Sequence, residues 1–165
     1  MNGFLKNYTS DVPASQTIYR IEQVLIRCGA SGITKEYLNT NGDIGSITFT
    51  IETPSGPMVI RLPADKEKAL DALWIDYVDG DKLSADGKSV SCNSRKKKRR
   101  VDFAEQAART SWKIIQDWVE VQLSMVQMRQ AEPMQVFLPY IYDGKRTYYD
   151  ALKDNQFKQL KEKNE

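Results

Sequence analysis

The chain has 165 residues, of which 41% are hydrophobic and 10% aromatic, a composition that supports a packed core and argues against global disorder. Its formal net charge is only +2, and no apolar stretch approaches the roughly 18 residues that a membrane span requires. Histidine is absent, which excludes Ser-His and Cys-His catalysis within the chain, and the two cysteines form neither a metal-binding pair nor a disulfide framework.

The first half of the chain predicts a helix followed by a three-stranded antiparallel meander. Residues 1–13 form a polar arm, after which apolar residues recur at helical spacing until Gly29. The pattern then changes to alternation on both sides of Asn41-Gly42, a strong hairpin signal, and a second turn follows at Pro54-Ser55-Gly56. The alternating positions of the three strands are Ile33, Lys35 and Tyr37, then Ile47, Phe49 and Ile51, then Met58, Ile60 and Leu62.

A second helix begins at Asp65, and its apolar stripe ends at Val78. Residues 79–100 have no periodicity, so we expect a flexible basic loop. Asp102 and Glu105 resemble the N-cap and N3 positions of a capping box at the start of a long helix that ends near Gln130. The apolar stripe of this helix packs along the first two helices or pairs with a second copy, so a homo-oligomer through the long helix is one of two open alternatives.

After the long helix, Glu132-Pro133 breaks the pattern, and Met134–Tyr142 is interpreted as a short strand. Residues 153–165 form a charged tail. The fold class is therefore α+β: a helix, a three-stranded antiparallel meander, a helix, a long basic loop, a long helix, and a short C-terminal strand with a tail. We expect residues 14–152 to form a single domain.

The strongest local signal is the segment Ser94–Arg100, in which six of seven residues are Lys or Arg. Because these six residues carry a charge of +6 and the whole chain has a net charge of only +2, the remainder of the chain is net negative (2 − 6 = −4). Dense cations repel one another unless anions lie nearby, and phosphate backbones supply such anions. The residues expected to contact nucleic acid or another phosphate ligand are Arg95, Lys96, Lys97, Lys98, Arg99 and Arg100, followed on the long helix by Arg109 and Lys113. The alternative is a solvated loop whose charges are balanced by Asp76, Asp79, Asp81 and Asp86.

Three aromatic residues near cations are candidates for stacking on unpaired bases, namely Trp112, Tyr140 and Tyr142. The alternative is that Trp112 belongs to the core and that the tyrosines pack the C-terminal segment. The chain contains no phosphate-binding P-loop, no dinucleotide-binding glycine pattern and no calcium-binding loop. We therefore expect no enzymatic activity, no cofactor and no metal site.

Several short motifs follow one another in a recognisable order. After Pro13 and the first apolar helix, these motifs are Gly29-Ala30, Thr53-Pro54-Ser55-Gly56, Arg61-Leu62-Pro63-Ala64, Trp112 through Trp118-Val119-Glu120, and Phe137-Leu138-Pro139-Tyr140. The pattern resembles a group of small proteins encoded by tailed bacteriophages and prophages, most of which have no assigned activity. The resemblance covers about residues 12–142. It implies a phage origin and action in the bacterial cytoplasm, and it supplies no catalytic residues.

Two functions follow from these observations. The first is a non-enzymatic phage accessory protein that binds nucleic acid through the basic loop. The alternative is a phage anti-defence protein that binds a host defence protein or sequesters a nucleotide signal. For both functions we expect a cytoplasmic location and no membrane partner.

Overall fold

The computed structural model describes residues 6–38, 42–54, 56–85 and 98–155. The chain divides into two compact units, of which the first comprises Met1–Ile18 with Ala64–Gln116 and the second comprises Tyr19–Pro63 with Asp117–Glu165. Two helices, α1 (Ala14–Arg27) and α3 (Ala104–Gln127), contribute residues to both units. The α+β class is confirmed, whereas the single domain over residues 14–152 stays a prediction.

The second unit contains a three-stranded antiparallel sheet in the order β1-β2-β3. Its strands are β1 (Ala30–Tyr37), β2 (Ile44–Thr53) and β3 (Gly56–Pro63), which confirms the predicted meander. The register places Phe49 of the central strand opposite Ile33 and Ile60. Because side chains alternate between the two faces of a sheet, the buried residues Ile47, Phe49, Ile60 and Leu62 share one face.

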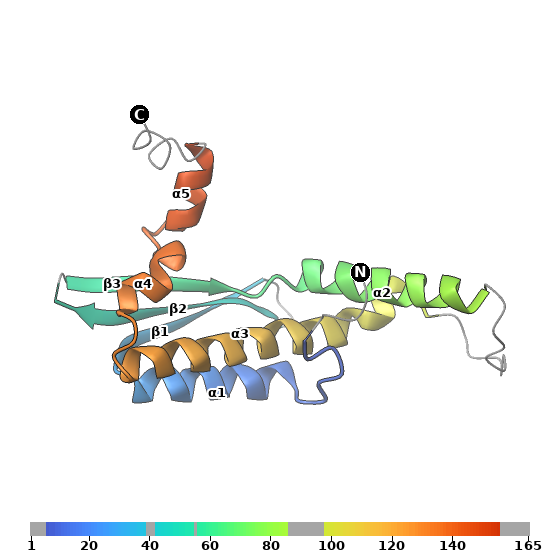
Figure 1. Cartoon of the computed structure of the whole chain (residues 1–165), viewed down its shortest axis with the longest axis horizontal. Helices are drawn as coiled ribbons and strands as arrows, with labels where there is room; N and C mark the ends of the chain where they lie inside the picture. Colours follow the sequence, from blue (N-terminus) through green and yellow to red (C-terminus); the bar gives the residue numbers. More distant parts are fainter. Residues whose placement is uncertain (1–5, 39–41, 55, 86–97, 156–165) are drawn as a thin grey trace. The chain divides into compact units, whose positions relative to one another are not determined.

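Helices α1 and α3 lie side by side on this apolar face in the second unit (Figure 1). The core residues that they contribute there are Ile21 and Leu25 from α1 and Val119 and Leu123 from α3. At the margin of the sheet, the Lys35 ammonium forms an ion pair of 2.8 Å with the Glu22 carboxylate of α1. The hydrogen bond that Lys35 donates to Glu22 in this ion pair raises the pKa of Lys35 above its usual value. Apolar burial on the inner face and a charge pair at its edge thus hold α1 to the sheet.

The segment predicted as a strand, Met134–Tyr142, is helical over most of its length, so that prediction is wrong. Helix α4 (Pro133–Phe137) is followed by the 3-10 turn η2 (Leu138–Tyr140). Pro133 occupies the first helical turn, and the Gln135 side chain accepts a hydrogen bond of 2.9 Å from the Glu132 backbone N–H. Proline at this position and a reciprocal cap both favour a helix.

Strand-like pairing after residue 137 is limited, within the described residues, to two isolated bridges, Ile60–Ile141 and Tyr142–Thr147. Helix α5 (Tyr148–Asp154) then begins with Thr147 as its N-cap, whose hydroxyl accepts a hydrogen bond from the Asp150 backbone N–H at 3.2 Å. Figure 1 shows α5 on the side of the sheet opposite to α1 and α3. The predicted tail lies outside the described residues from position 156 onward.

The first unit contains α2 (Lys66–Ala85). The Asp65 carboxylate caps this helix by accepting a hydrogen bond of 3.0 Å from the Lys68 backbone N–H. The helix passes through Gly80 and ends at Ala85, so the prediction of a loop from residue 79 is wrong for residues 79–85. A single glycine costs a helix only about 1 kcal/mol, which explains why it does not end α2.

Residues 6–13, predicted as a polar arm, are attached to α3. The Thr110 hydroxyl donates a hydrogen bond of 3.2 Å to the Asn7 carbonyl oxygen, and the Gln106 amide donates one of 3.2 Å to the Ser10 carbonyl oxygen. Helix α3 confirms the predicted long helix, although it ends at Gln127. Near its end Val121 and Met128 are exposed, and pairing with a second copy stays a prediction. Within the described part of the chain, none of the helices combines the length and the apolar character that crossing a membrane requires.

Candidate functional site

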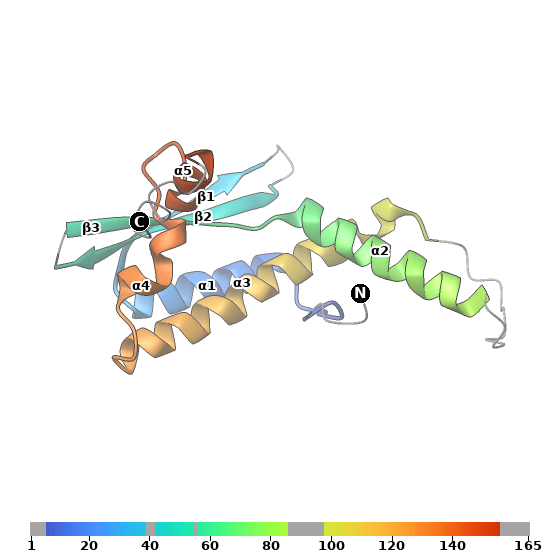
Figure 2. The ribbon, with the colours of Figure 1, turned by 45° about the horizontal axis from the view of Figure 1, so that its top comes forward.

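The turn at Arg100–Phe103, where the basic run ends, lies beside helix α2 (Figure 2), and Arg100 contacts that helix through its guanidinium. The Arg100 Nε and Nη2 atoms donate to Asp71 Oδ1 at 3.0 and 2.6 Å, and Nη2 also donates to Glu67 Oε2 at 3.0 Å. The hydrogen bonds to Asp71 and then to Glu67 raise the pKa of Arg100 further above its usual range. Exposed ion pairs of this kind add little to stability, so the contact mainly fixes where the run ends.

Arg99 and Asp102 form the first turn after the run, the 3-10 turn η1 (Arg100–Phe103). The Asp102 carboxylate accepts a hydrogen bond of 2.7 Å from the Arg99 backbone N–H, and this bond lowers the pKa of Asp102. The sequence predicted Asp102 as the N-cap of the long helix; the structure instead places Asp102 at the third position of η1, whose N-cap is Arg99. The Arg99 side chain remains 80% exposed, with a long contact of 3.4 Å to Asp102 Oδ1.

Lys98 connects the run to a group of aromatic side chains. Its backbone N–H donates a hydrogen bond of 3.3 Å to the Tyr77 hydroxyl, and its ammonium lies 5.3 Å from the centre of the Phe103 ring. A cation at this distance over a ring is attracted by the negative π face. Lys98 is exposed, so its charge is presented to solvent next to an aromatic surface.

We call Trp74, Tyr77 and Phe103 the aromatic trio, and all three are half-buried. The ring centres are 5.7 Å apart for Trp74 and Tyr77, 6.2 Å for Trp74 and Phe103, and 5.2 Å for Tyr77 and Phe103. On α2, Leu70, Leu73, Trp74 and Tyr77 follow helical spacing, which places them on one side of the helix. Leu70 and Leu73 are buried with Ala107, and Phe103 packs against that cluster. Phe103 therefore rests on a small apolar core, and its ring contacts with Trp74 and Tyr77 join these two residues to that core.

Other predicted site residues in the first unit are engaged within α3. The Arg109 guanidinium donates to Glu105 Oε1 at 2.8 Å and to Gln106 Oε1 at 3.1 Å, and the Lys113 ammonium donates to Gln116 Oε1 at 3.2 Å. Trp112 is only 1% exposed. Stacking of a base on Trp112 is therefore wrong, because neither face of its ring is accessible, and the core alternative holds for this residue.

Tyr140 and Tyr142, the other stacking candidates, belong to the second unit. The Tyr140 ring packs against Trp118 with ring centres 5.1 Å apart. The Tyr142 ring has the Arg61 guanidinium 5.2 Å from its centre, and its hydroxyl donates a hydrogen bond of 2.9 Å to the Gly144 carbonyl oxygen. Both tyrosines are half-buried, and these contacts agree with the alternative that they pack the C-terminal segment.

Arg95, Lys96 and Lys97 lie outside the described residues. For the described cations of the run, the partner carboxylates are Glu67, Asp71 and Asp102, which differ from the four aspartates predicted to balance the loop. The acids at positions 79, 81 and 86 are not among the described side chains. Sequence reasoning also missed the aromatic trio, because Trp74 and Tyr77 fit a core stripe and Phe103 lies far away along the chain. The spacing of four residues between Glu67 and Asp71 places two carboxylates on one side of a helix, and this spacing was the local sign in the sequence that the helix could bind a cation such as Arg100.

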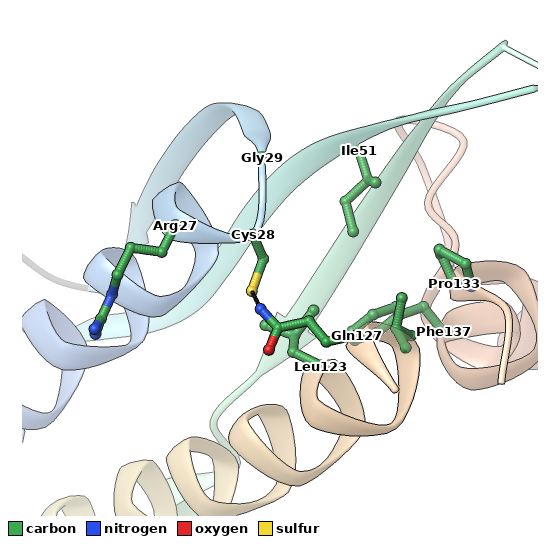
Figure 3. Close-up of a pocket in the computed structure, with 9 residues that line it drawn as sticks. Arg27, Cys28, Gly29, Ile51, Leu123, Gln127, Pro133 and Phe137 are labelled. Carbon is green, nitrogen blue, oxygen red and sulfur yellow. Dashed lines mark hydrogen bonds between the residues drawn. The ribbon is translucent and has the colours of Figure 1, made fainter. Parts of the chain in front are cut away.

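A second candidate is a pocket of about 380 Å³ in the second unit (Figure 3). The amide of Gln127 donates a hydrogen bond of 3.4 Å to the Cys28 sulfur, and both residues line the pocket. Arg27 extends away from the apolar wall, and its Nε donates to the Gln23 carbonyl oxygen at 3.2 Å. The wall residues are Ile51, Leu123, Val126, Pro133 and Phe137. One thiol and one amide on apolar walls would suit many small molecules, so the pocket does not define a class of ligand.

Among the described residues, no group of three or more Cys, Asp and Glu side chains is arranged to hold a metal ion. The arrangement that combines charge, aromatic surface and exposure is the end of the basic run with the aromatic trio, which we call the basic–aromatic site (Lys98, Arg99, Arg100, Trp74, Tyr77 and Phe103). Comparison of the chain with protein-family models, with curated proteins and with solved structures finds no match.

Proposed function

We propose that the protein binds the phosphate backbone of nucleic acid through the basic run, without catalysing a reaction. The observation that carries this proposal is the concentration of six Lys and Arg residues in seven positions of a chain that is otherwise net negative. Lys98 and Arg99, at the described end of the run, are exposed. Binding of such a segment to a polyanion is driven by release of the counterions condensed on the phosphates.

Within this proposal Arg100 has a different role from its neighbours. Its guanidinium already contacts Asp71 and Glu67, two carboxylates that would repel an approaching phosphate. We therefore assign phosphate contacts to the segment Arg95–Arg99, and we assign Arg100 the role of an anchor that ties this segment to α2. Five contacts on a single strand correspond to a slope of log affinity against log salt of about −3.5.

The test is a salt titration of binding, measured by fluorescence anisotropy of labelled single- and double-stranded DNA. Replacing Lys96, Lys97 and Lys98 by Ala is expected to make the single-strand slope less negative by about 2, because three phosphate contacts are lost. The matched control replaces three other lysines, Lys68, Lys145 and Lys153, by Ala, since these side chains are exposed and the change in net charge is the same. The absence of binding at low salt, or equal slopes for the two triple variants, would overturn the proposal.

The biological setting of this binding is a further part of the proposal, supported by the resemblance to phage-encoded proteins alone. In that setting the chain is an accessory protein of phage DNA or RNA metabolism in the bacterial cytoplasm. Nucleic-acid binding through the basic run does not depend on that setting, and the titration tests the binding by itself.

A further inference from the structure

The basic–aromatic site combines two kinds of contact that nucleic acids offer separately. Lys98 and Arg99 present positive charge, and the aromatic trio presents half-buried rings next to Lys98. All of these residues belong to the first unit. The phosphates of either a duplex or a single strand can bind the positive charges. The aromatic rings, by contrast, need a flat apolar surface on which to stack.

The rings are held in place before any ligand arrives. Phe103 is packed against the buried cluster of Leu70, Leu73 and Ala107, and Tyr77 is tied through its hydroxyl to the Lys98 backbone. Ring orientations differ by 31° to 64° among the three pairs, so the trio is a faceted surface on which bases can rest at more than one angle. A fixed platform lowers the entropy lost when a base is ordered on it.

Bases inside a duplex are covered on both faces by their neighbours, so they cannot stack on a protein side chain without being unpaired. Unpaired bases of a single strand can stack on aromatic rings irrespective of sequence, as in proteins that combine cationic grooves with aromatic platforms. The carboxylates of Glu67 and Asp71 disfavour phosphate at Arg100, so the strand meets positive charge at Lys98, beside Phe103. Charge and ring are therefore close enough to be used by adjacent parts of one nucleotide chain.

We propose that the nucleic acid bound by this protein is single-stranded, with unpaired bases stacked on Trp74, Tyr77 and Phe103 while Lys98 and Arg99 contact the adjoining phosphates. This inference rests on the proposed function, since it specifies which polynucleotide the basic run binds. It assigns a ligand-binding role to three aromatic residues that otherwise serve as packing.

The first experiment changes the ligand and leaves the protein intact. Affinities are measured for a 12-nucleotide oligothymidylate, for an abasic 12-mer with the same phosphates and no bases, and for a 12-base-pair duplex. Loss of one stacked base weakens binding by at least about fivefold, so the thymidylate is expected to bind at least fivefold tighter than the abasic strand and tighter than the duplex.

The outcomes separate this inference from the proposed function. Equal affinity for the thymidylate and abasic strands, or a duplex that binds as tightly as the thymidylate, would overturn the stacking inference and leave nucleic-acid binding standing. Failure of all three ligands to bind at low salt would overturn the proposed function and the inference with it. Because the unmodified protein is used, the result does not depend on how well a variant folds.

The second experiment assigns the stacking to the trio. Tyr77→Leu removes a ring but keeps an apolar side chain, and Tyr77→Phe keeps the ring but removes the hydroxyl that contacts Lys98. The preference for thymidylate over the abasic strand is expected to fall several-fold in Tyr77→Leu and to persist in Tyr77→Phe, with both variants checked for folding by circular dichroism. An unchanged preference in a folded Tyr77→Leu variant would exclude Tyr77 from the binding surface.

Discussion

Phe137 joins the short helix α4 to the sheet of the second unit, and its replacement by Ala tests that packing. The side chain is fully buried, and its ring meets Phe49 and Trp118 edge to face, with interplanar angles of 86° and 82°. The next residue, Leu138, is 39% exposed and provides the matched control.

The expected loss follows from these contacts. Full burial of a phenylalanine side chain contributes about 1.5–3 kcal/mol, and each edge-to-face pair adds about 0.5–1.5 kcal/mol. A residual cavity brings the expected cost of Phe137→Ala to about 3–5 kcal/mol in the free energy of unfolding. Phe137→Leu keeps most of the apolar volume and loses the two ring contacts, so we expect about 1–2 kcal/mol. The exposed Leu138→Ala control is expected to cost less than about 1 kcal/mol.

Urea denaturation followed by far-ultraviolet circular dichroism measures these differences. With a typical slope of about 2 kcal/mol per molar urea, Phe137→Ala is expected to lower the midpoint by about 1.5–2.5 M. Midpoints that fall equally for Phe137→Ala and Leu138→Ala would refute the difference in burial between these two residues. A loss below about 1 kcal/mol in Phe137→Ala would refute its place in the core.

Three further predictions concern a helix end, acid stability and the anchor of the basic run. Just after α3, Arg129 has a φ of +57° and its N–H donates to the Val126 carbonyl oxygen, a conformation that favours glycine. Arg129→Gly is therefore expected to raise the free energy of unfolding, measured by thermal denaturation, by up to about 1 kcal/mol. The control Arg129→Ala is expected to bring no gain. Hydrogen bonds from the Ser46 hydroxyl and then from Arg61 lower the pKa of Glu36, so the folded state binds fewer protons than the unfolded state. The resulting stabilisation is complete above the ordinary pKa of 4.5, and we expect the free energy of unfolding to fall as the pH drops below that value, more steeply in the unmodified protein than in Glu36→Gln. Equal pH profiles of stability for the two proteins would refute this coupling. Finally, Arg100→Ala is expected to leave the salt slope of DNA binding unchanged and Lys98→Ala to make it less negative by about 0.7, whereas equal changes in both would refute the anchor role.

The elements set by local chemistry could be predicted from the sequence. The meander was predicted from alternation and from turns, and the second turn closes at Gly56, whose φ of +111° favours glycine. The Thr53 hydroxyl fixes that turn by donating a hydrogen bond of 2.7 Å to the Gly56 carbonyl oxygen. The long helix was likewise predicted from a stripe that repeats over many turns. In each case the deciding contacts join residues that are close along the chain.

The errors occurred where short patterns support two interpretations. Val136, Phe137 and Leu138 suggested alternation, but Pro133 and Gln135 provide the cap of a helix, and that cap was the better signal. Gly80 was interpreted as part of a turn, although helix α2 continues past it to Ala85.

The candidate site could be predicted only in part, because its contacts span long separations. The basic run is visible in the sequence as a charge concentration, but the pairing of Arg100 with Asp71 joins positions 29 residues apart. The meeting of Phe103 with Trp74 and Tyr77 depends in the same way on how η1 packs against α2. Periodicity places Trp74 on the apolar side of its helix and gives no sign that its ring stays half-exposed in contact with Phe103. Trp112 was the opposite error, since a neighbouring lysine in the sequence does not keep a ring exposed.

The most direct test of nucleic-acid binding at the basic–aromatic site is photo-crosslinking of the intact protein to a single-stranded oligonucleotide that carries 5-iodouridine, with the linked peptides identified by mass spectrometry. We expect crosslinks in the peptides that contain Trp74 and Tyr77 and in the peptide that contains Phe103, and their loss in high salt. Crosslinks confined to the peptides of Tyr140, Tyr142 and Tyr148, or the absence of any crosslink at low salt, would contradict binding at this site.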